Sequence, residues 1–185
     1  MRVLIACEYS GQMRRAFRAK GHEAWSCDVL PADDASHFHF QTDVREVLGM
    51  EWDLLIGHPP CTRLCNSGVR WLHAPPAGKT IDQMWRELDE ATAFFSLLLN
   101  ADIPHVAIEN PVMHRYAKER ISGYFDPGPA VQPWMHGHMQ VKATCFWRRN
   151  LPPLTPTKNV RAEMLRLPYG ERAKIHHASP GPDRW

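Results

Sequence analysis

Two short motifs place chemically capable side chains directly after apolar stretches that end in proline. Cys61 follows residues 54–60, Leu-Leu-Ile-Gly-His-Pro-Pro. Glu109 and Asn110 follow the apolar residues 105–108 and precede another proline. A cysteine thiolate is a nucleophile, and a carboxyl group can donate or accept a proton. Because proline lacks a backbone donor, each strand should stop there and present these residues at its end. The pattern predicts a nucleophile and an acid–base group at one rim of a sheet.

A zinc site is an alternative interpretation of the same region. His58, Cys61, Cys65 and His73 carry the nitrogen and sulfur donors that zinc prefers. Their spacing, His-x2-Cys-x3-Cys-x7-His, is irregular, and the two prolines restrict the first pair. The thiolate interpretation is therefore favoured, and no metal is expected.

The elements that must position these residues begin with a strand–turn–helix–strand pattern. Residues 2–7 form a continuous apolar run, which is typical of a strand buried on both faces. Residues 12–20 indicate a short basic helix, and residues 22–27 a second strand that ends at Asp28. Such a unit implies two parallel strands with a right-handed crossover. An acidic residue after the second strand is where a Rossmann-like fold holds a ribose.

The rest of the chain extends this pattern. The expected elements are a short helix capped by Asp43, a central strand before Cys61, a long loop over 62–79, a helix over 80–100, a strand over 105–111, and a β-hairpin formed by 130–136 and 140–149. The fold class predicted is α/β, with a Rossmann-like, mostly parallel sheet, a C-terminal β-hairpin and a proline-rich tail. We expect a single domain over 1–185, with its core in 1–150 and an irregular tail over 151–185.

Composition limits the class of protein. The chain has 185 residues and a formal net charge of +2, so it gives no strong overall signal for nucleic-acid binding. No apolar run approaches the ~18 residues that a membrane span requires. The five cysteines are odd in number and lie in apolar segments, which favours reduced thiols over a disulfide framework. A cytoplasmic protein without a membrane partner is expected.

The order of the motifs resembles that of the DNA cytosine-5 methyltransferases, and the chain looks like a small, phage-like or truncated member. Pro59-Pro60-Cys61 and Glu109-Asn110-Pro111 are similar to the Pro-Cys and Glu-Asn motifs of that family. Tyr9-Ser10-Gly11 is similar to its aromatic-Ser-Gly turn, and Asp28 and Asp43 match its two acidic cofactor contacts. The resemblance covers roughly residues 1–112. Residues 132–149 are weakly similar to a later Gln/Arg motif of the family.

The resemblance implies a reaction and a cofactor, S-adenosylmethionine. Cys61 would add to C6 of a cytosine, Glu109 would hydrogen-bond to N3, and Asn110 would brace the loop, so that C5 takes the methyl group. The pocket that binds the cofactor would be lined by Tyr9, Ser10, Gly11, Asp28, Val29, Asp43, Val44 and Pro59. Pro60, Lys142 and Thr144 are candidate substrate contacts. The substrate would be nucleic acid or a pyrimidine nucleotide, and a base in a duplex would first have to leave the stack.

The sequence departs from the family in three places. Met13 stands where the family turn carries a further glycine, and the target-recognition insert and the closing C-terminal segment have no counterpart. A partner protein or a homo-oligomer that completes the site, or a smaller substrate, would account for this. The alternative function is a non-catalytic module that binds S-adenosylmethionine or a nucleotide and acts with a partner.

Overall fold

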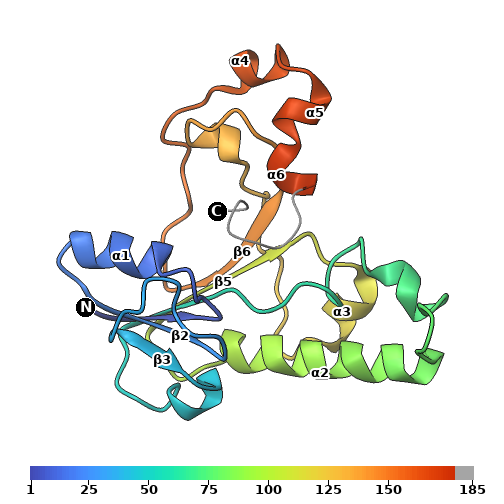
Figure 1. The fold of residues 1–185 in the computed structure, drawn as a ribbon, viewed down its shortest axis with the longest axis horizontal. Helices are drawn as coiled ribbons and strands as arrows, with labels where there is room; N and C mark the ends of the chain where they lie inside the picture. Colours follow the sequence, from blue (N-terminus) through green and yellow to red (C-terminus); the bar gives the residue numbers. More distant parts are fainter. Residues whose placement is uncertain (178–185) are drawn as a thin grey trace.

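A six-stranded sheet forms the centre of the computed structural model, which describes residues 1–177 (Figure 1). Its strands are β1 (Arg2–Ala6), β2 (Glu23–Asp28), β3 (His39–Gln41), β4 (Leu54–Gly57), β5 (His105–Pro111) and β6 (Thr144–Arg149). They lie in the order β3-β2-β1-β4-β5-β6, and every neighbouring pair is parallel except β5 and β6. The predicted mostly parallel α/β fold is confirmed.

The helices are short, apart from one. They are α1 (Gln12–Ala19), α2 (Ile81–Leu99), α3 (Arg115–Arg120), α4 (Arg161–Leu165), α5 (Tyr169–Arg172) and α6 (Lys174–His177), with 3-10 turns η1 (Val44–Glu46), η2 (Val69–Leu72) and η3 (Pro133–Met135). The long helix α2 begins at a capping box, in which the Thr80 side chain accepts from the Gln83 backbone and the Gln83 side chain accepts from the Thr80 backbone.

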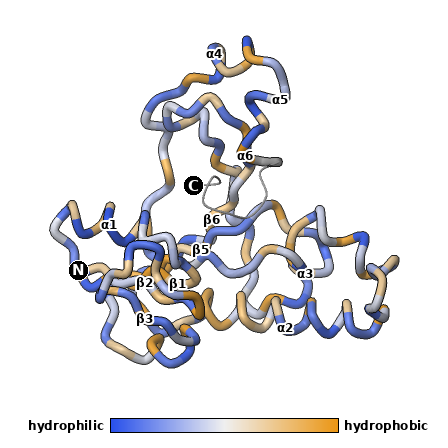
Figure 2. Tube along the Cα trace, viewed as in Figure 1, coloured by the Kyte–Doolittle hydropathy of each residue, from blue (hydrophilic) through white to orange (hydrophobic). Residues whose placement is uncertain are grey.

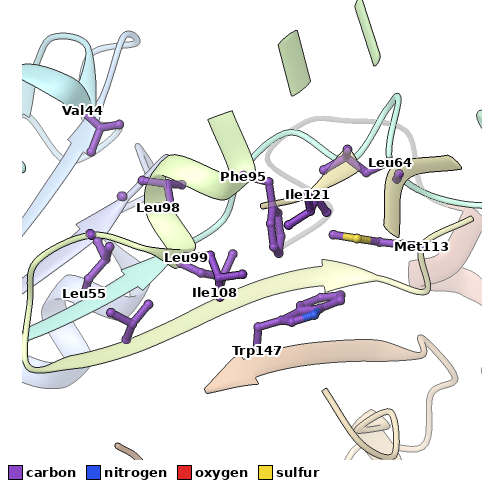
Figure 3. Close-up of a cluster of buried hydrophobic side chains, with 14 of the residues drawn as sticks. Val44, Leu55, Leu64, Phe95, Leu98, Leu99, Ile108, Met113, Ile121 and Trp147 are labelled. Carbon is purple, nitrogen blue, oxygen red and sulfur yellow. The ribbon is translucent and has the colours of Figure 1, made fainter. Parts of the chain in front are cut away.

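Each face of the sheet has its own apolar cluster. On one face, Phe95 and Leu98 of α2 pack with Leu55 and Ile108 of the sheet, and Trp147 joins them from β6 (Figure 3). On the other face, the alternate strand residues Val3, Ile5, Leu54 and Ile56 pack with Met13 and Phe17 of α1. The apolar colouring accordingly gathers at the strands and the inner side of α2 (Figure 2). Burial on both faces explains the continuous apolar strand runs.

The strand order creates the place where a site can form. In doubly wound sheets the chain direction across the sheet reverses between two central strands, and ligands bind at the carboxyl ends of those strands. Here the reversal falls between β1 and β4, which are hydrogen-bonded neighbours. The segment after β1 and the segment from His58 to Cys61 after β4 therefore emerge side by side.

The predicted C-terminal β-hairpin is wrong. Its second arm exists as β6, but β6 pairs antiparallel with β5, from Pro111–Thr144 to Val106–Arg149. Of the first arm, only Val131 forms a bridge, to Thr144, and residues 133–135 form η3 instead. The physical reason is that Pro133 removes a backbone donor from the first arm, whereas the edge of β5 offers a full row of partners.

Residues 130–143 and 152–177 pack together beside the sheet and are called the C-terminal lobe below (Figure 1). Backbone hydrogen bonds join its two parts: the Lys158 amide donates to the Met135 carbonyl at 3.0 Å, and the Val141 amide donates to the Arg172 carbonyl at 2.7 Å. The tail was expected to be irregular over 151–185 apart from one short helical patch over 161–167. That patch is present as α4, and α5 and α6 follow it. The last part of that prediction, 178–185, lies outside the described residues.

Candidate active site

Cys61 and Glu109 line one cavity of about 480 Å³ at the carboxyl rim of β1, β4 and β5. The exits of β1 and β4 and the end of β5 form most of its wall, and Lys142 and Thr144 close it from the side of β6. Its lining residues are Cys7, Glu8, Tyr9, Ser10, Gln12, Met13, His58, Pro59, Pro60, Cys61, Glu109, Asn110, Pro111, Lys142 and Thr144. The two motifs that the sequence singled out thus meet across β4 and β5.

Asn110 holds the two motifs in place. Its side chain is 1% exposed, and Nδ2 donates to the Pro59 carbonyl oxygen at 2.9 Å. That carbonyl belongs to a Pro-Pro step, which cannot supply backbone donors of its own to the neighbouring strand. The amide of Asn110 gives this carbonyl a donor, and it fixes the segment that carries Cys61 relative to Glu109.

The turn after β1 brings an acidic side chain into the same cavity. Cys7 has φ 58°, a left-handed backbone conformation that is uncommon outside glycine and that turns the chain away from the sheet. Glu8 follows and is 8% exposed; its Oε1 accepts from the Ser10 hydroxyl, while Oε2 has no partner within the described residues. A buried carboxylate oxygen without a partner is costly, so its presence beside a cavity points to a ligand that supplies a donor or a positive charge.

Two further cavity-lining residues carry buried polar atoms that lack a partner among residues 1–177. They are Nε2 of His58 and Oδ1 of Asn110. The other ring nitrogen of His58, Nδ1, lies 3.4 Å from Oε2 of Glu109. The cavity therefore offers polar groups of both kinds, and His58 contacts the carboxyl group that the motif analysis placed in the acid–base role.

The sulfur atoms of the cavity differ in their electrostatic setting. Burial, reinforced by the charge of Asp28, raises the pKa of Cys7 to about 12, so this thiol stays protonated at neutral pH. A hydrogen bond donated to the Cys65 sulfur, together with burial and the charge of Glu109, raises the pKa of Cys61. Burial and the charge of Glu109 thus oppose a resting thiolate at Cys61, and its role as nucleophile stays a prediction.

The pKa of Cys65 shifts in the opposite direction. The hydrogen bond from Cys61, with further donors from Ser67 and Gly68, lowers the pKa of Cys65 although burial opposes it. The Ser67 hydroxyl lies 3.0 Å from the Cys65 sulfur, and Cys65 is 7% exposed. Unlike Cys61, Cys65 does not line the cavity.

A second cavity, of about 160 Å³, adjoins the first, because Cys7 and Pro60 line both. Its other lining residues include four of the predicted cofactor contacts, Asp28, Val29, Asp43 and Val44, together with Cys27, Thr42 and Phe94. They come from the end of β2 and from the segment that enters η1. Asp43 caps this turn, its Oδ1 accepting from the Arg45 amide at 2.9 Å.

Gly11 is the one predicted cofactor contact that lines neither cavity. It begins α1 with φ 71°, and a Cβ at this position would lie 2.5 Å from the Arg14 guanidinium and 2.8 Å from the Asp34 carboxylate. The glycine thus leaves room for an ion pair packed against the turn. Arg14 is 1% exposed and also donates to Ser26 at 2.6 Å, so its side chain ties α1 both to β2 and to the loop that carries Asp34.

The sequence analysis missed Glu8 and gave His58 only a metal-binding role. A signal existed for both: each directly follows the apolar run of a central strand, where parallel strands deliver side chains to the rim. Met13, noted as a departure from the family turn, lines the larger cavity. The five cysteines all lie in the described part of the chain and are all free thiols, as expected.

The structure gives the zinc interpretation no cluster to use. Within residues 1–177, no group of three or more His, Cys, Asp or Glu side chains could hold a metal ion. His73 lies against the rings of Trp85 and Tyr116, with centroid separations of 6.0 and 5.8 Å. In the same part of the chain, no helix combines the length and apolar character needed to cross a bilayer.

Comparison with known proteins yields a structural likeness only. No protein-family model and no curated protein matches this sequence. Among solved structures, the chain is similar to a prophage-encoded E. coli protein described as a DNA modification methyltransferase, with a TM-score of 0.47 and 17% identity. The alignment covers 84% of this chain and 53% of that protein, so the chain spans about half of its length.

Proposed function

We propose that the protein transfers a methyl group from S-adenosylmethionine to C5 of a cytosine through a covalent bond to Cys61. The observation that carries this proposal is the shared cavity of Cys61 and Glu109, joined to a second cavity lined by Asp28 and Asp43. A nucleophile and an acid–base group next to an acidic pocket for a nucleoside is the arrangement that such a reaction requires.

The residues present fit the cofactor on their own chemistry. Asp28 and Asp43 would accept hydrogen bonds from the ribose and the adenine amino group, as acidic residues after the second and third strands do in nucleotide-binding sheets. The unpartnered Oε2 of Glu8 would face the ammonium group or the sulfonium charge. When bound, S-adenosylmethionine supplies an electrophilic methyl group.

The chain's own residues would then act on the pyrimidine. Cys61 loses its thiol proton to solvent, and its sulfur forms a bond to C6. The electron pair of the C5–C6 double bond then moves toward C5, which becomes nucleophilic. With a proton on its carboxyl group, Glu109 donates a hydrogen bond to N3 and so stabilises the negative charge that develops on the ring. Asn110 keeps the two motifs in register through Pro59. After methylation, loss of the C5 proton to solvent restores the double bond and releases the cysteine.

Charge distribution favours a nucleic acid over a free nucleotide as the substrate. The C-terminal lobe carries six Lys and Arg against two Asp and Glu, whereas residues 1–129 carry 13 against 17. Among the described residues, none of the six lobe cations forms an ion pair. One of them, Lys142, also lines the cavity. Cations without carboxylate partners beside a site are suited to contact phosphates.

The decisive experiment uses cofactor labelled in its methyl group with two substrates, a cytosine-containing oligonucleotide and dCMP. We expect transfer to at least one of them, and a loss of roughly a thousandfold or more in Cys61→Ala. Calorimetry should show unchanged cofactor affinity in that variant. Cys145→Ala, which removes a buried thiol outside both cavities, is the matched control.

A 5-fluorocytosine oligonucleotide tests the covalent step directly. Fluorine cannot leave C5 as a cation, so the adduct should persist and appear by mass spectrometry at Cys61. Folded protein that binds the cofactor but methylates no pyrimidine and forms no adduct would contradict the proposal. It would favour the non-catalytic binding module instead.

A further inference from the structure

We infer that His58 selects cytosine over uracil, because it fixes the order of donor and acceptor on the Glu109 carboxyl group. The inference deepens the proposed function and rests on it for the contact between Glu109 and the base. His58 has no part in the reaction described above, yet its Nδ1 lies 3.4 Å from Oε2 of Glu109, and both residues line the larger cavity. His58 is a positioning residue in this role, since it acts on the base through Glu109.

The register of the sheet places the two side chains next to each other. The strands β4 and β5 are parallel, and Gly57 is in register with Ile108, so His58 and Glu109 each lie one residue further along. Side chains in register on neighbouring parallel strands point to the same face. The His58 amide also donates to the Ala6 carbonyl at 3.0 Å, which holds its backbone against β1. The contact between imidazole and carboxyl group therefore follows from the strand pairing.

The second ring nitrogen of His58 indicates which of the two groups donates. A neutral imidazole carries one N–H, and its other nitrogen is an acceptor. Nε2 of His58 is buried and has no partner among residues 1–177. Buried N–H groups without an acceptor are rarer in proteins than acceptors without a donor. The hydrogen is therefore assigned to Nδ1, which donates it to Oε2 of Glu109.

A donor at Nδ1 determines where a proton can sit on Glu109. A protonated carboxyl group has one O–H donor and one oxygen that only accepts. Because Oε2 accepts from His58, the proton belongs on Oε1. The carboxyl group then presents a donor at Oε1 beside an acceptor at Oε2, which keeps a second lone pair for a ligand. If the imidazole hydrogen were on Nε2, Oε2 would instead donate to Nδ1, and the order would be reversed.

Cytosine and uracil require opposite orders at this edge of the ring. Cytosine has an acceptor at N3 beside an amino donor on C4, whereas uracil has an N3–H donor beside a carbonyl acceptor on C4. With N3 opposite Oε1, the order held by His58 matches cytosine at both atoms and uracil at neither. A site built to hydrogen-bond one molecule rejects an analogue that leaves its buried polar groups unpaired.

The first test determines the tautomer of His58 and needs neither substrate nor cofactor. In protein with isotopically labelled histidine, hydrogen–nitrogen correlation spectra distinguish a ring nitrogen that carries hydrogen from one that does not. The His58 signals are those that disappear in His58→Asn. At about pH 8, where a free imidazole is neutral, we expect hydrogen on Nδ1 and none on Nε2. Hydrogen on Nε2 with none on Nδ1 would overturn the inference.

The second test measures base preference as the ratio of the dUMP to the dCMP dissociation constant, by calorimetry. We expect wild type to favour dCMP by about tenfold or more. His58→Leu removes the donor, so either oxygen of Glu109 can carry the proton, and the preference should fall to about threefold or less. Damage to the pocket alone would weaken both nucleotides by the same factor and leave the ratio unchanged.

His58→Asn separates the loss of a contact from the loss of its direction. The amide can turn either its NH2 group or its oxygen toward Oε2 of Glu109. This variant should therefore bind dCMP more tightly than His58→Leu does, yet discriminate less than wild type. The control is His37→Leu, at an exposed histidine that lines neither cavity, and it should keep the wild-type ratio. A wild-type ratio in His58→Leu, or no preference in wild type, would overturn the inference.

Neither measurement requires methyl transfer. A preference for dCMP that depends on His58, in a protein that methylates no pyrimidine, would support base selection by His58 and contradict the proposed reaction. Methyl transfer to cytosine, with an unchanged ratio in His58→Leu, would leave the proposed function standing and remove the role of His58.

Discussion

Asn110 and Pro59 are joined by a hydrogen bond of 2.9 Å that ties the end of β5 to the exit of β4. The bond crosses between the two segments that carry Glu109 and Cys61. In it, a buried side-chain amide is the donor and the carbonyl of the Pro-Pro step is the acceptor. The geometry of the site therefore depends on one buried amide.

Asn110→Ala should lower both stability and Cys61 reactivity. The Pro59 carbonyl would lose its donor, and a buried polar group left unpaired costs about 1–3 kcal/mol. Chemical denaturation and iodoacetamide labelling measure the two effects. Asn100→Ala is the control: this side chain also donates to a carbonyl, that of Ser122 at 2.9 Å, but it is exposed and remote from the cavity. If Asn110→Ala lost less stability and less Cys61 labelling than the control variant, this role of Asn110 would be contradicted.

Glu8→Gln should weaken binding of S-adenosylmethionine by about tenfold, equivalent to about 1.4 kcal/mol. The substitution keeps the shape and the bond with Ser10 but removes the buried negative charge that faces the cavity. The ligand-free protein should not lose stability, since an unpaired buried carboxylate is itself unfavourable. Calorimetry and thermal unfolding separate the two quantities. In the control, Glu51→Gln changes an exposed carboxyl group far from the site; equal effects in both variants would rule out a specific contact.

Asp34→Asn should destabilise the protein at neutral pH but not in strong acid. Hydrogen bonds from Arg14 and Arg15 lower the pKa of Asp34 from 3.8 to about 2 in the folded protein. A lowered folded-state pKa contributes stability above the unfolded value, and that contribution is lost as pH falls from about 4 toward 2. We expect a loss of roughly 1–3 kcal/mol at pH 7, because Arg14 is buried.

The measurement for Asp34 is denaturant unfolding of wild type and variant across pH. The curves should converge as the pH approaches the folded-state pKa. Asp33→Asn, at the neighbouring exposed position, should match wild type throughout. A difference that persists unchanged in acid would show that the effect does not come from the ion pair.

Replacing Lys158, Arg166 and Lys174 by Gln should weaken binding of a single-stranded oligonucleotide and leave transfer to dCMP unchanged. Each lost phosphate contact reduces the slope of log K against log salt by about 0.7 for single strands. Fluorescence anisotropy at several salt concentrations measures the slope. The control removes the same charge from Lys20, Arg86 and Lys118, which are exposed outside the C-terminal lobe. An equal change in slope for both triple variants would indicate general attraction only.

The parallel sheet and the meeting of Cys61 with Glu109 could be predicted because the responsible signals are local. Apolar runs stopped by proline define β4 and β5, and helical periodicity defines α2, which was expected over 80–100 and spans Ile81–Leu99. Once the strands are parallel, their carboxyl ends must share a rim. The residues beside each strand end were therefore placed together without knowledge of any distance.

Other features depend on contacts that the sequence does not encode locally. Residues 144–149 have the composition of a strand, but whether they pair with 130–136 or with β5 depends on which edge is open. The donors beside Cys65 come from the turn at Ser67 and Gly68, and no spacing rule for the cysteines alone would reveal them.

The sparse interior of the C-terminal lobe has a consequence for how the molecule moves. Within its described residues, only Met164 and Ala173 are buried apolar side chains, whereas the sheet is packed on both faces. Regions with few buried contacts open at a small fraction of the global unfolding free energy. The lobe is thus expected to rearrange more readily than the rim that aligns sulfur and carboxyl.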